Sequence, residues 1–141
     1  MPDAPALSNI PYDDLVVDAR FGPYDEIVTE ELAARLAGPI GERTPAAQTP
    51  PAVYPVLFLR ALRRAMGGIP AGSILAKQEL DVHRELPVPS AVRVTTWVGA
   101  KEVRRERPFV TIEFDIRDEA DRPVLTGRKI RVWPTGPGER A

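Results

Sequence analysis

The chain has 141 residues, 43% hydrophobic and 28% charged, with a formal net charge of −1. This composition is typical of one globular domain with a substantial core. The near-zero charge excludes an electrostatic basis for binding nucleic acid or an anionic membrane surface. The absence of cysteine excludes disulfides, thiol nucleophiles and thiolate metal sites. We expect a cytoplasmic protein, because no apolar run is long enough to span a bilayer and no signal peptide pattern opens the sequence. We expect no cofactor or metal, because the sequence has no GxGxxG, no P-loop and no His/Cys metal spacing.

The N-terminal part predicts a tail, a strand and a short helix. Residues 1–11 are expected to form a loose tail. Residues 15–21 and 24–28 predict a first strand that is broken by a Gly-Pro pair. Thr29 is placed as the N-cap of an amphipathic helix, with two glutamates in its first turn, and Gly38 is expected to end it.

A central helix is predicted in residues 50–68, PPAVYPVLFLRALRRAMGG. Prolines confine its start to about residues 52–54, and two glycines supply its stop. Its first half is apolar on every side, which requires enclosure by other structure. Arg60, Arg63 and Arg64 give the second half a polar side. We expect these arginines to mark the side of the helix that its own strands leave open, where they are candidates for phosphate or partner binding.

After the helix the hydrophobic period changes from 3.6 to 2, which indicates strands. The strand segments are residues 73–83, 92–103, 109–118 and 124–133. Their short connections require antiparallel neighbours, and their one apolar face needs a cover. The predicted fold is therefore α+β, a single hot-dog domain over residues 12–133 in which a long antiparallel sheet wraps one helix, with a tail at 134–141. The side chains expected to face Phe58 and Leu62 of the helix are Ile74, Leu80, Val94, Val98, Ile112, Phe114 and Ile116.

Residues 12–133 resemble the MaoC-like branch of the hot-dog family, the R-specific enoyl-thioester hydratases and 3-hydroxyacyl-thioester dehydratases. The resemblance rests on the proline-led helix and on IVTEELAARLAGPIGERTP, AKQELDVHRELPV and DEADRPVLTGRKIRVW. It implies a substrate that is a thioester of coenzyme A or of an acyl carrier. It also implies that the working unit is a double hot-dog, a homodimer or a heterodimer with a catalytic hot-dog subunit.

Activity in that family depends on a loop before the central helix with the pattern Gly-Asp-any-Asn-Pro-any-His. Hydration of an enoyl thioester needs a base that takes a proton from water and an acid that protonates the α-carbon. Gly41 and Pro45 fit the pattern, whereas Glu42 stands for the aspartate and Thr44 for the asparagine. The histidine position is Ala47, which cannot transfer a proton. The resemblance therefore implies a broken catalytic dyad.

Two residues remain as candidate replacements for the missing groups. Glu42 is either a water-activating base, as in a hot-dog thioesterase, or a solvated loop residue. His83, the only histidine, is either a relocated acid or a residue without a catalytic role. The candidate substrate-binding positions, with core packing as the alternative at Tyr54, are Thr44, Pro45, Ala47 and Tyr54.

Two functions follow from these observations. The first is a non-catalytic subunit that shapes an acyl-thioester tunnel while a partner hot-dog chain supplies the aspartate and histidine. The second is an enzyme in its own right, either a thioesterase or an atypical enoyl-CoA hydratase that uses Glu42. Ala47 favours the first.

Overall fold

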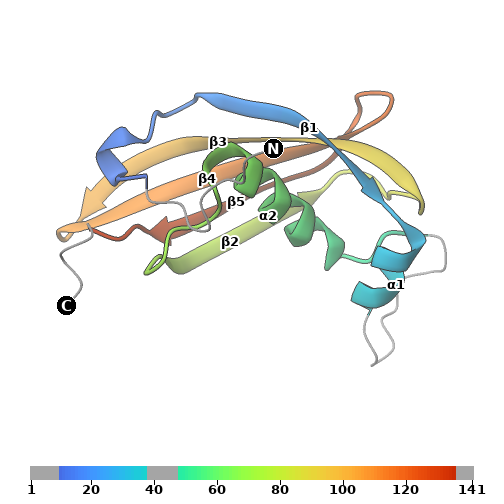
Figure 1. Cartoon of the computed structure of the whole chain (residues 1–141), viewed down its shortest axis with the longest axis horizontal. Coiled ribbons are helices and arrows are strands. Elements are labelled where there is room, and N and C mark those ends of the chain that lie inside the picture. Colours follow the sequence, from blue (N-terminus) through green and yellow to red (C-terminus); the bar gives the residue numbers. More distant parts are fainter. Residues whose placement is uncertain (1–9, 38–47, 136–141) are drawn as a thin grey trace.

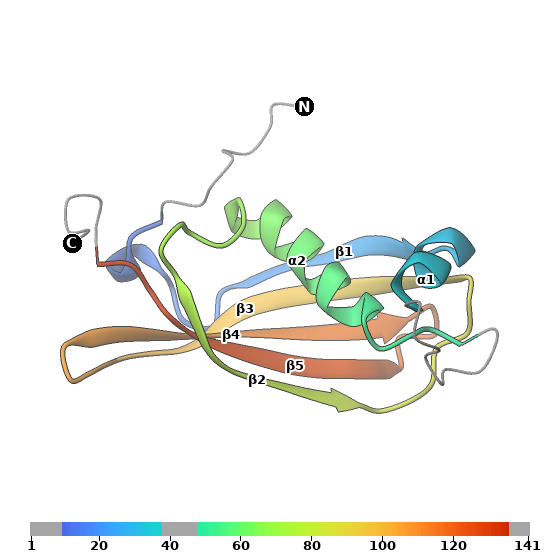
Figure 2. The ribbon, with the colours of Figure 1, turned by 90° about the horizontal axis from the view of Figure 1, so that it is seen from below.

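The computed structural model describes residues 10–37 and 48–135, which form one curved antiparallel sheet with a helix on its concave side (Figures 1 and 2). The strand order is β1-β3-β4-β5-β2. The elements are a 3-10 helix Tyr12–Asp14, β1 Arg20–Val28, α1 Glu30–Ala37, α2 Val53–Met66, β2 Ile74–Val82, β3 Ser90–Arg104, β4 Arg107–Asp118 and β5 Pro123–Val132. The predicted α+β class and the antiparallel pairing of the later strands are confirmed.

The central helix α2 begins and ends close to the positions that its flanking prolines and glycines predict. Gly67 follows it with φ at 82°, and its N–H donates to the Arg63 carbonyl at 2.9 Å. A residue with a side chain is strained in this left-handed conformation, which explains the glycine. The helix is enclosed on the side that faces the sheet, where Leu57, Phe58 and Leu62 are fully buried, whereas Leu59 is 44% exposed, so the expected enclosure on every side is only partly met.

The N-terminal elements agree in part with the sequence interpretation. Thr29 caps α1 as predicted, because its Oγ1 accepts the Leu32 N–H at 3.0 Å. The first strand is shorter than expected at its start, since β1 begins only at Arg20. The strand also continues through the Gly-Pro pair. The register of its pairing with β3 shifts between Phe21 and Tyr24, which accommodates these two residues without ending the strand.

The core lies between α2 and the strands β1, β3 and β4. The Phe58 ring stacks on Phe114 of β4 with the ring centroids 4.3 Å apart. Five of the predicted core residues are 0–1% exposed, which confirms their assignment: Val94, Val98, Ile112, Phe114 and Ile116.

Two predicted core residues on β2 are not in the core, and the sequence interpretation was wrong there. Ile74 is 57% exposed and Leu80 is 38% exposed. A bulge between Leu75 and Lys77 reverses the alternation, so Ile74 pairs with Val132 and lies on the face away from α2. Leu80 is on the helix side, but α2 packs on β1 and β3 and leaves β2 at the uncovered edge (Figure 2).

Candidate functional site

The segment that enters α2 is bonded to the connection between β2 and β3. The Thr49 N–H donates to the Leu86 carbonyl at 2.9 Å, and the Gln48 amide donates to Glu85 Oε1 at 2.7 Å. Within the described part of the chain, the Thr49 hydroxyl is buried without a hydrogen-bond partner. The segment that leads into α2 is thus held against the connection between β2 and β3.

A cleft of about 570 Å³ adjoins this junction, between the β2–β3 connection and the β4–β5 turn. Its size is in the range of small-molecule sites. The charged side chains that line it are Arg84, Glu85, Asp118, Glu119 and Arg122. Two cations against three carboxylates leave no excess of positive charge, so the lining does not have the character of a phosphate site.

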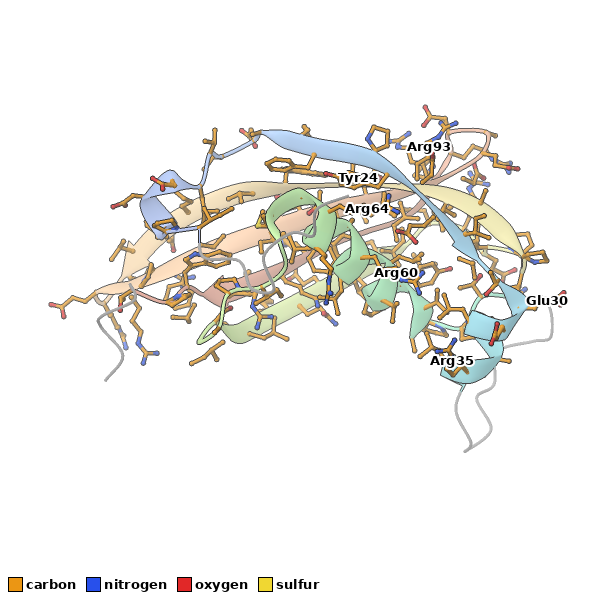
Figure 3. The ribbon with its side chains drawn as sticks, in the orientation of Figure 1. Tyr24, Glu30, Arg35, Arg60, Arg64 and Arg93 are labelled. Carbon is orange, nitrogen blue, oxygen red and sulfur yellow. The ribbon has the colours of Figure 1, made fainter. Side chains whose placement is uncertain are left out.

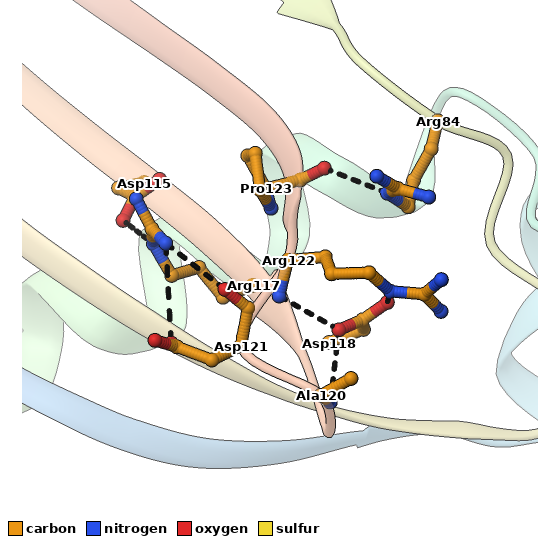
Figure 4. Close-up of polar contacts among 8 residues, drawn as sticks. All are labelled: Arg84, Asp115, Arg117, Asp118, Ala120, Asp121, Arg122 and Pro123. Carbon is orange, nitrogen blue, oxygen red and sulfur yellow. Dashed lines mark hydrogen bonds and ion pairs between the residues drawn. The ribbon is translucent and has the colours of Figure 1, made fainter.

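Asp118 fixes the shape of the β4–β5 turn beside the cleft (Figure 4). Its Oδ1 accepts the backbone N–H groups of Ala120 and Arg122, each at 2.9 Å, and its Oδ2 accepts the Arg122 Nε at 2.9 Å. The hydrogen bond from the Arg122 backbone is the largest of the effects that hold the pKa of Asp118 below its ordinary value. Arg84 reaches the same turn through the Pro123 carbonyl at 3.1 Å.

Most of the predicted loop residues lie outside the described part of the chain: Glu42, Thr44, Pro45 and Ala47. Tyr54 lies in the first turn of α2 and is 4% exposed, and burial raises the pKa of its hydroxyl. His83 follows β2, is exposed, and places Nε2 2.9 Å from Thr126 Oγ1. Thr126 pairs with Asp115, on the face of the sheet away from α2, so the structure does not bring His83 and Tyr54 together.

Arg60 and Arg64 of α2 are 47% and 49% exposed, and each also reaches across to β1 (Figure 3). Their role in phosphate or partner binding stays a prediction. Both pair with Glu26 of β1, at 3.3 and 3.5 Å, and Glu26 is only 8% exposed. Arg64 also lies over the Tyr24 ring, 5.4 Å from its centroid. Among the described residues, Arg63 is exposed and has no acidic partner. Glu26 lies 34 positions before Arg60, beyond the reach of a helical pattern.

A buried cation on β5 was missed by the sequence interpretation. Lys129 is 7% exposed, and its Nζ lies 4.8 Å from the centroid of the Phe58 ring. Burial, and then the nearby Arg131, lowers the pKa of the Lys129 amine. The signal was present in the alternation, because Lys129 and Arg131 follow Leu125 at even spacing and therefore share its helix-facing side.

The described residues bring no three acidic or imidazole side chains together as metal ligands. In the same residues no helix has the length and hydropathy to cross a bilayer.

Neither protein-family models nor curated proteins gave a match to this sequence. Solved structures did. The R-hydratase PhaJ1 from Pseudomonas aeruginosa is 21% identical, with 91% of this chain and 88% of that chain covered and a TM-score of 0.68. The MaoC-like dehydratase from Rhodospirillum rubrum is 20% identical over 86% of this chain and 94% of that one, with a TM-score of 0.67. This chain has the hot-dog fold.

A third hot-dog structure is the HadBC complex of Mycobacterium tuberculosis, a 3R-hydroxyacyl-ACP dehydratase. It is 11% identical over 80% of this chain and 93% of that one, with a TM-score of 0.65. The likeness to MaoC-like dehydratases and R-hydratases, which the sequence motifs predicted, is thus confirmed at the level of the hot-dog fold.

Proposed function

We propose that this chain is a MaoC-like hot-dog subunit of an acyl-thioester hydratase or dehydratase, and that it binds the thioester without carrying the catalytic dyad. The observation that carries the proposal is Ala47, at the position where the resembled loop has its histidine. The hot-dog fold shared with an R-hydratase and a MaoC-like dehydratase supports it.

The chemistry requires a second source of proton transfer. Water adds to an enoyl thioester only if one group takes its proton and an acid serves the α-carbon. A methyl group at position 47 serves neither purpose. A catalytic hot-dog partner that carries an intact loop would supply both groups, while this chain contributes binding surface. The HadBC structure, a dehydratase complex with the same fold, is compatible with such an arrangement.

The edge strand β2 is the surface that we propose for this association. Its residues are exposed or half-buried along its whole length, and the exposed apolar ones on the helix side include Leu80 and Val82. An unpaired strand edge is a template for another strand. Pairing along β2 would extend the sheet and would cover these side chains, either with a second copy of the chain or with a catalytic relative.

The test is hydration of crotonyl-CoA by the purified chain, alone and after co-expression with an intact hot-dog chain from the same genome. We expect no turnover alone and turnover with the partner. Robust turnover by the single chain that is lost in Glu42→Ala would replace this proposal with a Glu42-based enzyme. Turnover lost in His83→Ala would move the acid to the end of β2.

Light scattering on the pure protein tests the self-association. A dimeric mass at tens of micromolar supports pairing of two copies, whereas a strictly monomeric mass, together with failure to co-purify with the intact chain, contradicts association altogether.

A further inference from the structure

Lys129 occupies an unusual position for a lysine, inside the concave side of the sheet. It pairs with Ile112 of β4, which is fully buried, and with Gln78 of the edge strand β2. Its ammonium lies over the Phe58 ring of α2. The side chain therefore lies at the boundary between the closed core and the uncovered strand.

No negative charge compensates this cation within the described residues. The described ion pairs join other residues, and the neighbours of Lys129 across the two adjacent strands are Ile112 and Gln78. The charged side chain that lowers the pKa of Lys129, after burial, is another cation, Arg131, whose Nε donates to the neutral Ser73 Oγ at 2.6 Å. Burial of an uncompensated charge is unfavourable, and a cation–π contact offsets only part of the loss of hydration.

Lys129 is 7% exposed, and the edge strand β2 beside it is exposed along most of its length. Next to it on the helix side of β2, Leu80 is 38% exposed and Leu75 is 44% exposed. These two leucines flank the exposed Gln78, which pairs with Lys129, so the surface beside the cation is apolar on both sides of one amide.

We infer that Lys129 is the anchor of a binding site for a carboxylate carried on an aliphatic chain, seated between α2 and β2. The carboxylate would form a charge-assisted hydrogen bond with the ammonium, and the chain would lie on Leu75 and Leu80. Arg131 adds to the positive potential at the same place. This inference rests on the proposed function and narrows it, because the thioester that fits such a site is one whose acyl chain ends in a carboxylate.

The experiment compares ligands that differ only in this terminal group. Binding of dodecanoyl-CoA and of the mono-CoA thioester of dodecanedioic acid is measured by calorimetry, and dodecanoate is compared with dodecanol by displacement of a fluorescent fatty probe. The wild-type chain should prefer the carboxylate member of at least one pair by about tenfold or more. A preference in the thioester pair identifies a carboxyacyl thioester as the ligand, and one confined to the second pair identifies a free fatty acid.

Two variants show whether Lys129 causes the preference. Lys129→Met should abolish it while affinity for dodecanol or dodecanoyl-CoA is kept. Arg128→Met is the matched control, because Arg128 is the preceding residue on β5, points to the other face and pairs with Glu79; it should leave the preference unchanged. If Lys129→Met does not fold, the Lys129 side-chain NMR signals of the wild type should shift on addition of dodecanoate and not of dodecanol.

The outcomes separate this inference from the proposed function. Equal affinities within both ligand pairs overturn the inference, and so does a preference for the carboxylate that survives Lys129→Met. A third outcome also overturns it: the wild-type chain is a dimer without a preference for carboxylate ligands, and Lys129→Met dissociates this dimer. The carboxylate that compensates Lys129 would then belong to the second copy of the chain. If dodecanoyl-CoA binds but no carboxylate is preferred, only the inference fails. If neither thioester binds, the proposed function fails, and the inference then stands only if dodecanoate is preferred over dodecanol.

Discussion

The two sides of the sheet differ in how their concave face is covered. On β3 and β4 the side chains under α2 are closed to solvent, and Phe114 is 1% exposed. On the neighbouring edge strand β2, Leu80 shares the same concave side and is 38% exposed. Leu80 lies beyond the bulge of β2 and follows the same alternation as the residues of β3 and β4, so the alternation does not explain its exposure.

The width of a helix explains it. A helix with its side chains is about 10–12 Å across, whereas five strands about 4.8 Å apart span about 19 Å. One helix therefore covers part of a five-stranded sheet, and α2 lies over β1 and β3. The rest of the concave face, along β2, stays exposed.

The largest effect on stability is expected from a substitution in the part of the sheet that α2 covers. Phe58→Ala should lower the free energy of unfolding by about 3–5 kcal/mol, because it removes a fully buried ring that stacks on Phe114. Urea denaturation measures the loss. Leu59→Ala is the control on the same helix, since Leu59 is 44% exposed, and it should change the value by less than about 0.5 kcal/mol. Equal losses in the two variants would mean that α2 is not the centre of the core.

A smaller effect is expected where α2 is fastened to β1. Glu26→Gln should destabilise the protein by about 1–2 kcal/mol, because a buried carboxylate loses its charge while Arg60 and Arg64 keep theirs. Asp25→Asn, at a side chain that is 92% exposed, is the matched control and should be nearly silent. Thermal unfolding of both variants measures the difference, and an unchanged midpoint for Glu26→Gln would mean that the arginines are held by packing alone.

At the boundary between the covered and the uncovered half, a substitution is expected to stabilise the protein. Lys129→Met should raise the free energy of unfolding at pH 7 by about 1 kcal/mol, because it removes an uncompensated buried charge. Arg128→Met on the exposed face should not. A loss of stability in Lys129→Met would reveal a compensating interaction for the ammonium.

The gain in stability expected for Lys129→Met should depend on pH. Burial lowers the pKa of Lys129, whose ordinary value is 10.5, so the folded chain releases this proton at a lower pH than the unfolded chain. Between the two pKa values the unfolded state binds more protons, and stability therefore rises with pH. The advantage of Lys129→Met should shrink as the pH approaches 10.5. Denaturation midpoints of both proteins between pH 7 and 10 measure this, and a constant difference would contradict the lowered pKa.

The smallest effect is expected on β2 itself. Val82 is 59% exposed, and Val82→Ala should cost less than about 0.5 kcal/mol in dilute solution. If β2 pairs with another chain, the loss should grow with protein concentration, because association stabilises the folded state by mass action. A loss that stays the same from one to one hundred micromolar would argue against β2 as the interface.

The sequence by itself determined the strands after the central helix and the ends of two helices. Alternation predicted β3, β4 and β5 close to their observed bounds, since a strand that is buried on one face repeats every two residues. Thr29 and Gly67 act locally, at the ends of helices, so their roles could be read without knowledge of the fold. Ala47 restricts the chemistry of its loop wherever that loop lies, because a methyl group cannot carry a proton.

The tertiary structure alone decided what depends on distant neighbours. The pairing of Arg60 with Glu26 joins residues 34 positions apart, and such a contact cannot be predicted from the periodicity of the sequence. The bulge in β2 places Ile74 on the face of the sheet away from α2, and the local composition gives no sign of this bulge. The same holds for Lys129, whose place in the alternation predicts a side of the sheet but not what lies above it. Whether that side is core or a binding surface depends on where a helix narrower than the sheet comes to rest.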